Sequence, residues 1–153
     1  MTQSRNLSFL GVYAGSSQSV PTMNLPNVGE VATVSATAAT GTVNFDVITQ
    51  SVLVYTTNAS GNWTLNIRGN STTSLNTMMS TGQSVTIAFF VTQGGTAYYN
   101  SAVTIDGSSV TPQWQGGTAP TAGNASGTDI YAYTIVKTGS ATYNVYASQT
   151  QFK

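Results

Sequence analysis

The stretch VNFDVITQSVLVYTTNASGNWTLNIRG, residues 43–69, decides the predicted fold. It holds three apolar runs separated by polar and turn-forming residues. The first and third runs place an apolar side chain at every second position, as a β-strand with one buried face does; these side chains are Val43, Phe45 and Val47, then Trp63, Leu65 and Ile67. The middle run, Val52–Tyr55, is β-branched and aromatic. Because the turn-forming residues Asn58–Gly61 separate the middle run from the third, the pattern predicts an antiparallel hairpin.

Trp63 is the largest side chain on the inward face of this hairpin. Residues 85–91 form another alternating run, with Val85, Ile87, Phe89 and Val91 on one face. We therefore expect Trp63 to lie buried between two sheets, in contact with the strand at residues 85–91.

Two further predicted elements flank residues 43–69 in the sequence. Residues 30–42 are small, with Thr and Ser at alternate positions, which favours an edge strand leading into the hairpin. Leu75, Met78 and Met79 fall at helical spacing and predict one brief helix, with Thr73 or Ser74 placed as its cap.

The remainder of the chain predicts more strands and turns. Asp106-Gly107 is a signal for a tight turn. The segment QGGTAPTAGNASGT, residues 115–128, has no apolar periodicity and is predicted to be a loop. Strands are expected at residues 97–105, 109–114, 130–136 and 141–147, with a tail at residues 148–153.

The predicted elements indicate an all-β fold. About eight short strands with turn signals between them are typical of an antiparallel β-sandwich. No helix-length segment separates the strands, which excludes parallel βαβ folds. A jelly roll is the first choice, an immunoglobulin-like Greek key the second and a closed barrel the third. We expect an extended N-terminal arm at residues 1–40, followed by a sandwich domain at residues 41–153.

Composition excludes several classes of partner. Only 5% of the 153 residues are charged, against a usual share of about 25%, and the net charge is zero. Four scattered cations make no basic stripe for nucleic acid, and no apolar run is long enough to span a membrane. Cysteine is absent, so the fold needs no particular redox compartment. A surface with so little charge favours association with neighbouring subunits.

A search for catalytic groups finds little. The chain has no His and no Cys, so the commonest general base, the commonest metal ligand and the thiol nucleophile are missing. The acidic residues are single and isolated in sequence: Glu30, Asp46, Asp106 and Asp129. A glycosidase would need two of them together, and a calcium site would need Asp106 with Asn100 and backbone carbonyls. Turn and capping roles explain these residues better, so we expect no catalytic residue, no metal and no cofactor.

The aromatic residues of the second half offer a weak ligand-binding signal. Alternating aromatic residues on strands more often form the core and cross-strand pairs than a sugar-stacking platform. Trp114 differs from the others because it opens the long loop, where a tip could present it. It is the one candidate ligand-binding residue.

Three stretches carry a resemblance to a known group of proteins: NWTLNIRG, FFVTQGGTAYYNSAVTIDG and PQWQGGTAP. Over residues 41–152 the chain resembles a module found in structural proteins of marine tailed bacteriophages, cyanophages especially. In that group the module often ends longer fibre-like or surface proteins of the virion. Here it follows an arm of about forty residues instead of a long shaft, which departs from the long-fibre pattern. The resemblance implies a virion component and supplies no catalytic residues.

These observations together lead us to expect a non-enzymatic bacteriophage structural protein, made in the host cytoplasm and placed on the particle surface as a decoration or cement. The alternative is a short head or tail fibre that binds a host surface glycan. Expected partners are other virion proteins and further copies of this chain, as a homo-oligomer such as a trimer. The Pro- and Gly-rich arm is expected to lie across a neighbour through its apolar side chains: Leu7, Phe9, Leu10, Tyr13, Met23 and Leu25.

Overall fold

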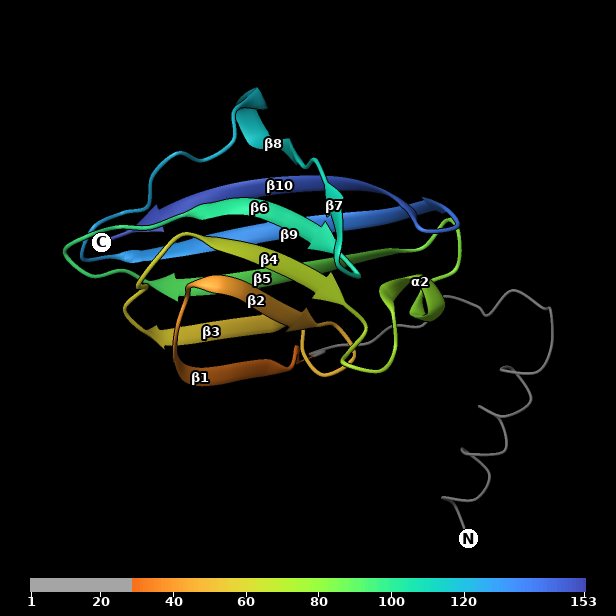
Figure 1. Cartoon of the computed structure of the whole chain (residues 1–153), viewed down its shortest axis with the longest axis horizontal. Coiled ribbons are helices and arrows are strands. Elements are labelled where there is room, and N and C mark those ends of the chain that lie inside the picture. Colours follow the sequence, from red (N-terminus) through yellow and green to blue (C-terminus); the bar gives the residue numbers. More distant parts are fainter. Residues whose placement is uncertain (1–28) are drawn as a thin grey trace, which may run out of the picture.

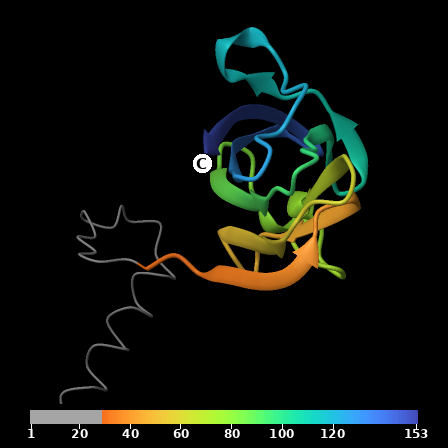
Figure 2. The ribbon, with the colours of Figure 1, turned by 90° about the vertical axis from the view of Figure 1, so that its left-hand side faces the viewer.

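The computed structural model describes residues 29–153, which form two β-sheets packed face to face (Figures 1 and 2). The fold is an all-β sandwich with one short helix, as predicted. Sheet A runs, from one edge to the other, β1 (Ala32–Ala38), β3 (Val52–Thr57), β5 (Ser84–Thr92), β9 (Thr128–Gly139), β10 (Thr142–Phe152) and β8 (Gln113–Trp114). Sheet B runs β2 (Gly41–Asp46), β4 (Trp63–Arg68), β6 (Asn100–Ile105) and β7 (Ser108–Val110).

The first six strands alternate between the sheets. β1, β3 and β5 lie in sheet A, β2, β4 and β6 lie in sheet B, and neighbours within this group are parallel. The chain therefore winds as a coil, crossing from one sheet to the other after each strand (Figure 2). The predicted hairpin is wrong, because β3 and β4 are consecutive in sequence yet belong to different sheets. Alternation shows that each strand buries one face, and both arrangements satisfy that requirement.

The turn-forming residues between β3 and β4 build a crossing, where a hairpin turn was expected. The Ala59 N–H donates to the Thr92 carbonyl (2.8 Å), and the Ser60 N–H donates to the Ala39 carbonyl (3.1 Å). Ala39 and Ala59 are both buried. Small side chains at these positions let the segment between β3 and β4 pack closely against the segments that follow β1 and β5. The backbone N–H groups of this segment therefore find carbonyl partners in its neighbours.

The second half of the sandwich is antiparallel, as predicted, except that the two-residue strand β8 pairs in parallel with β10. β9 pairs with both β5 and β10, and β7 pairs with β6. The predicted tight turn between β6 and β7 is confirmed, with positive φ at Asp106 (51°) and Gly107 (81°), as a two-residue hairpin requires. The antiparallel expectation thus holds here and fails for β1 to β6. The pairings do not confirm a jelly roll.

Helix α2 (Leu75–Met78) covers one end of the sandwich (Figure 1). The Ser74 hydroxyl accepts a hydrogen bond from the Thr77 N–H (3.0 Å), which confirms one of the two predicted caps. No helix among residues 29–153 has the length and apolar character needed to cross a membrane.

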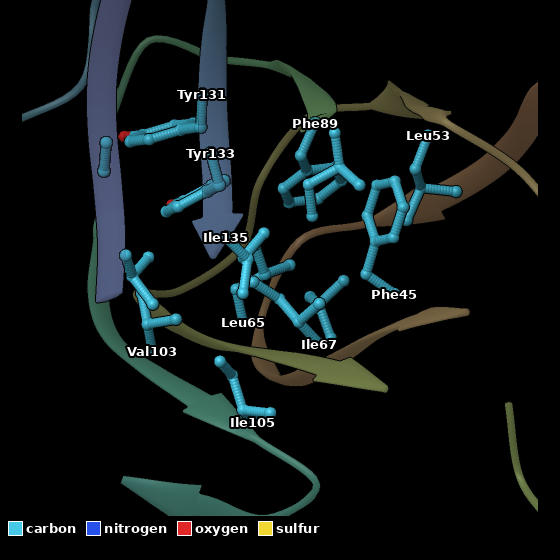
Figure 3. Packing of buried hydrophobic residues seen from close by; sticks show 14 of the residues in the cluster. Phe45, Leu53, Leu65, Ile67, Phe89, Val103, Ile105, Tyr131, Tyr133 and Ile135 are labelled. Atoms are coloured by element: carbon cyan, nitrogen blue, oxygen red, sulfur yellow. The ribbon is translucent and has the colours of Figure 1, made fainter. Parts of the chain in front are cut away.

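The core consists of apolar side chains from both sheets, and these side chains stand in register on neighbouring strands of each sheet (Figure 3). Across sheet B, Val43, Leu65 and Val103 form one row, and Phe45, Ile67 and Ile105 form the next. Across sheet A, one row runs Thr33, Leu53, Phe89, Tyr131 and Gln149, so it becomes polar at both ends. Contacting apolar rows exclude water along the length of both sheets.

Trp63 lies where the two halves meet, and its predicted position is confirmed. Its side chain is 1% exposed and meets the ring of Phe89 edge to face, with centroids 6.0 Å apart. It meets Tyr131 in the same way at 5.5 Å. The coil half and the antiparallel half therefore share one aromatic cluster.

The sheets also extend beyond the predicted boundaries. β1 pairs with β3 as an edge strand, as predicted, so the sandwich begins before residue 41. β10 continues to Phe152, whereas residues 148–153 were predicted to be a tail. Ser148, Gln149, Thr150 and Gln151 carry no apolar signal, and their pairing with β9 is what makes them a strand.

Candidate functional site

The two strands at the N-terminal end of the coil have open edges. Among the described strands, β1 pairs with β3 alone and β2 pairs with β4 alone. β1 carries no charged residue, and two of the most exposed apolar side chains lie at it, Val31 (62% exposed) and Val34 (67% exposed). An uncharged edge strand of seven residues is a template for pairing with another chain.

The opposite edges are protected. β7 has three residues and is followed by Thr111-Pro112, and Pro cannot extend a ladder of hydrogen bonds. β8 covers the middle of β10, and the loop that follows covers its end. There the Asn124 side-chain amide donates to the Phe152 carbonyl (2.8 Å) and the Gln149 amide donates to the Ala122 carbonyl (3.1 Å). Within the described residues, β1 is therefore the only edge strand that is seven residues long, carries no charge and has strongly exposed apolar side chains beside it.

Two of the candidate acidic residues have structural partners. Arg68 Nε donates to Asp46 Oδ1 (2.7 Å) across neighbouring parallel strands β4 and β2. The Asp106 carboxylate accepts from the Leu75 N–H (2.7 Å) and the Asn76 N–H (3.0 Å), so it caps helix α2 from the β6–β7 turn. Glu30 is exposed and receives a long hydrogen bond from the Ser51 hydroxyl (3.4 Å).

Asp129 lies fully buried at the start of β9. Its carboxylate accepts from Gln93 Nε2 (2.9 Å) and from the Asn124 N–H (3.1 Å), and Gln93 also bonds the backbone of Tyr98 on both its carbonyl and its N–H. Burial raises the pKa of this carboxyl, and the hydrogen bonds it accepts oppose the rise. A side chain at Gly123 would overlap the Tyr98 carbonyl and the Asp129 carboxylate. Asp129 is thus the centre of a polar cluster that fastens the long loop to the sandwich.

Lys137 fastens the helix in a comparable way. Its side chain is buried, and Nζ donates to the carbonyls of Asn76 (2.6 Å) and Met79 (2.7 Å). Asn76 lies within α2 and Met79 is its C-cap, so Lys137 joins the helix to strand β9. No group of three or more Asp, Glu, His or Cys side chains that could hold a metal lies among residues 29–153.

Trp114, the predicted ligand-binding candidate, is half-buried, and its ring lies against the buried Tyr133 ring with centroids 6.0 Å apart. It is therefore partly a core residue and is not held at a free loop tip. It also lines three surface hollows, of about 390, 280 and 270 Å³. The largest hollow is also lined by Tyr146, which is 45% exposed and which the sequence did not single out. The alternation around it, with Val145 and Ala147 buried, was the available signal that Tyr146 faces outward.

The predicted assembly residues Leu7, Phe9, Leu10, Tyr13, Met23 and Leu25 lie outside the described residues. The calcium site that the sequence disfavours is not assembled among the described residues. The Asn100 amide donates to the carbonyls of Trp63 (3.2 Å) and Ala102 (2.9 Å), and Asp106 caps α2. Searches against protein-family models, curated proteins and solved structures find no match to this chain.

Proposed function

We propose that this chain is a non-enzymatic structural protein of a bacteriophage particle, which decorates or cements the particle surface and joins its neighbours by strand pairing. The observation that carries the proposal is the uncharged edge of β1, which has no paired strand on its outer side within residues 29–153 and has Val31 and Val34 exposed beside it. Backbone N–H and C=O groups along such an edge give affinity to an added strand, and alternate side chains give it specificity.

Charge supports assembly as well. The chain has a net charge of zero and four cations, so no electrostatic repulsion opposes close packing of copies or of other virion proteins. Its solubility depends on Thr, Ser, Asn and Gln, which are compatible with a protein–protein interface once their polar groups are paired.

The structural roles of the charged residues support a non-enzymatic function. Asp46 is paired with Arg68, Asp106 caps α2, and Asp129 is buried in a hydrogen-bonded cluster. The phage assignment rests on the resemblance of the stretches NWTLNIRG, FFVTQGGTAYYNSAVTIDG and PQWQGGTAP to a module of phage structural proteins.

The test is imaging, at subunit resolution, of purified particles of the phage that encodes this chain. Copies repeated over the head lattice, with β1 paired to a strand of a neighbour, are the expected result. A few trimers at a tail or vertex would favour the fibre alternative. The proposal is wrong if mass spectrometry of the purified particles detects no copy of the chain.

A further inference from the structure

The outer face of sheet A has a hollow beside Tyr146, formed by the sizes of the side chains in successive cross-strand rows. One row runs Thr86, Thr134, Tyr146 and Gln113 across strands β5, β9, β10 and β8. The next row is small, with Ala88, Ala132 and Ser148. The small side chains of this second row leave the surface of the sheet lower than the neighbouring Tyr146 ring, and this difference in height forms the hollow.

The edge of the sheet gives this hollow a wall. β8 and the 3₁₀ turn η1 (Gln115–Gly117) stand at the side of β10 and project from the body of the sandwich (Figure 1). Trp114 fixes the wall, because its ring packs on the buried Tyr133. The amide side chains of Gln113 and Gln115, on either side of Trp114, are exposed at the hollow. The wall therefore presents the Gln113 and Gln115 amides, which both donate and accept hydrogen bonds, on either side of the packed Trp114 ring.

The lining has a distinct chemical character. None of the residues lining the 390 Å³ hollow is charged, and its polar and apolar groups are mixed. A second hollow of about 270 Å³ shares Trp114, Gln115 and Ser148 with it and continues toward Pro120 and Gln149. An exposed aromatic ring flanked by amides and hydroxyls suits a ligand with an apolar face and a rim of hydroxyls.

We propose that the hollow beside Tyr146 binds a neutral saccharide. The C–H face of a pyranose ring packs on the ring of Tyr146, and its hydroxyls bond the amides of Gln113 and Gln115 and the hydroxyl of Ser148. An anionic sugar would find no cation among the lining residues to offset the loss of water around its carboxylate. A saccharide site would also serve the fibre alternative, whose ligand is a host surface glycan, but it does not rest on the decoration role proposed above.

The test uses the full chain labelled with ¹⁵N and follows backbone amide shifts during titration. The probes are lactose, maltotriose, triacetylchitotriose and 3′-sialyllactose at millimolar concentrations. We expect at least one neutral sugar to shift the amides of Gln113, Gln115 and Ser148. Sialyllactose is the matched anionic probe for lactose and should bind no more tightly than lactose.

Two substitutions separate specific binding from a general surface effect. Tyr146→Ala should weaken binding by about tenfold, through loss of the stacking ring, and Tyr146→Phe should retain most of the affinity. Phe152→Ala is the matched control, since Phe152 is an aromatic residue 51% exposed on the same strand, outside the hollow. The proposal is overturned if no neutral probe shifts these amides, if the shifts map elsewhere, or if Tyr146→Ala binds as the unaltered chain does.

Discussion

The coil half, which starts at β1 and β2, and the antiparallel half, built on β9 and β10, use buried polar residues differently. In the coil half the inward rows of sheet B are apolar. The buried Gln50 side chain accepts a hydrogen bond from the hydroxyl of Thr33 on the edge strand β1 (2.7 Å). In the antiparallel half, Asp129 and Lys137 of β9 are buried and hydrogen-bonded to the long loop and to helix α2. The buried Gln93 and Asn100, at the end of β5 and the start of β6, also form hydrogen bonds to residues of β9.

This difference matches the state of the edges. The buried polar residues of the antiparallel half hold the long loop and helix α2 in place, and the loop covers the edge of β10. The coil half has no such covering among the described residues, and its edge strands β1 and β2 lie open. One half is therefore closed by its own polar clusters, whereas the other is left suited to a partner.

The largest effect is expected at the junction of the halves. Trp63→Ala should lower the free energy of unfolding by about 3–5 kcal/mol, because the cavity would border both Phe89 and Tyr131. Denaturant unfolding of the two proteins measures it. Trp63→Phe should cost less, since Trp63 Nε1 has no hydrogen-bond partner within residues 29–153 and its loss leaves no group unpaired. Equal costs for the two substitutions would contradict this account of the junction.

The next effect concerns the polar attachment of the helix. Lys137→Ala should cost about 1–3 kcal/mol, because the carbonyls of Asn76 and Met79 would lose their buried donor. Lys153→Ala is the control, with the same change at an exposed lysine, and should stay within about 0.5 kcal/mol. Denaturant melts of both variants provide the comparison. If the two lysines behaved alike, Lys137 would have no structural role.

A smaller and pH-dependent effect is expected at Asp129. Burial raises the pKa of its carboxyl above the ordinary 3.8, so the folded chain binds this proton more tightly than the unfolded chain does. Its contribution to the free energy of unfolding is therefore fully present below pH 3.8. It is lost as the pH rises through the raised folded pKa.

The measurement for Asp129 is denaturant unfolding of the unaltered chain and of Asp129→Asn across this acidic range. The side-chain amide of the variant does not titrate, so the stability of the unaltered chain relative to Asp129→Asn should fall as the pH rises. A difference that stays constant with pH would show that burial does not perturb this carboxyl.

The smallest effect on stability is expected at the open edge. Val34→Lys changes a side chain that is 67% exposed and should alter the free energy of unfolding by no more than about 0.5 kcal/mol. It places a charge on β1 and should prevent strand pairing with a partner. Light scattering of the purified protein, and its incorporation into particles, measure the second effect. Gln151→Lys adds the same charge to an exposed position on β10 and should assemble normally. Normal assembly of Val34→Lys would exclude β1 as the contact.

The sequence predicted local features well wherever a local rule controls them. The Asp106-Gly107 turn follows from the positive φ that two-residue hairpins need, and the Ser74 cap follows from the orphan N–H groups of a helix start. The burial of Trp63 follows from its place in an alternating run. Trp114, the candidate binding residue, does precede the long loop, but it lies in β8 and its ring packs on Tyr133, whereas the exposed ring of the hollow is Tyr146.

The sequence by itself determined that this protein is all-β, which face of the alternating strands is buried and where the Asp106-Gly107 turn falls, because these depend on neighbours a few positions away. Only the tertiary structure decided that β3 and β4 lie in different sheets, that β1 to β6 pair in parallel, and that Asp129 is buried. Period-2 alternation is equally satisfied in a hairpin and in a coil, and the choice between them is made by packing between segments far apart in the chain. The open edge of β1 and the hollow beside Tyr146 are consequences of that choice.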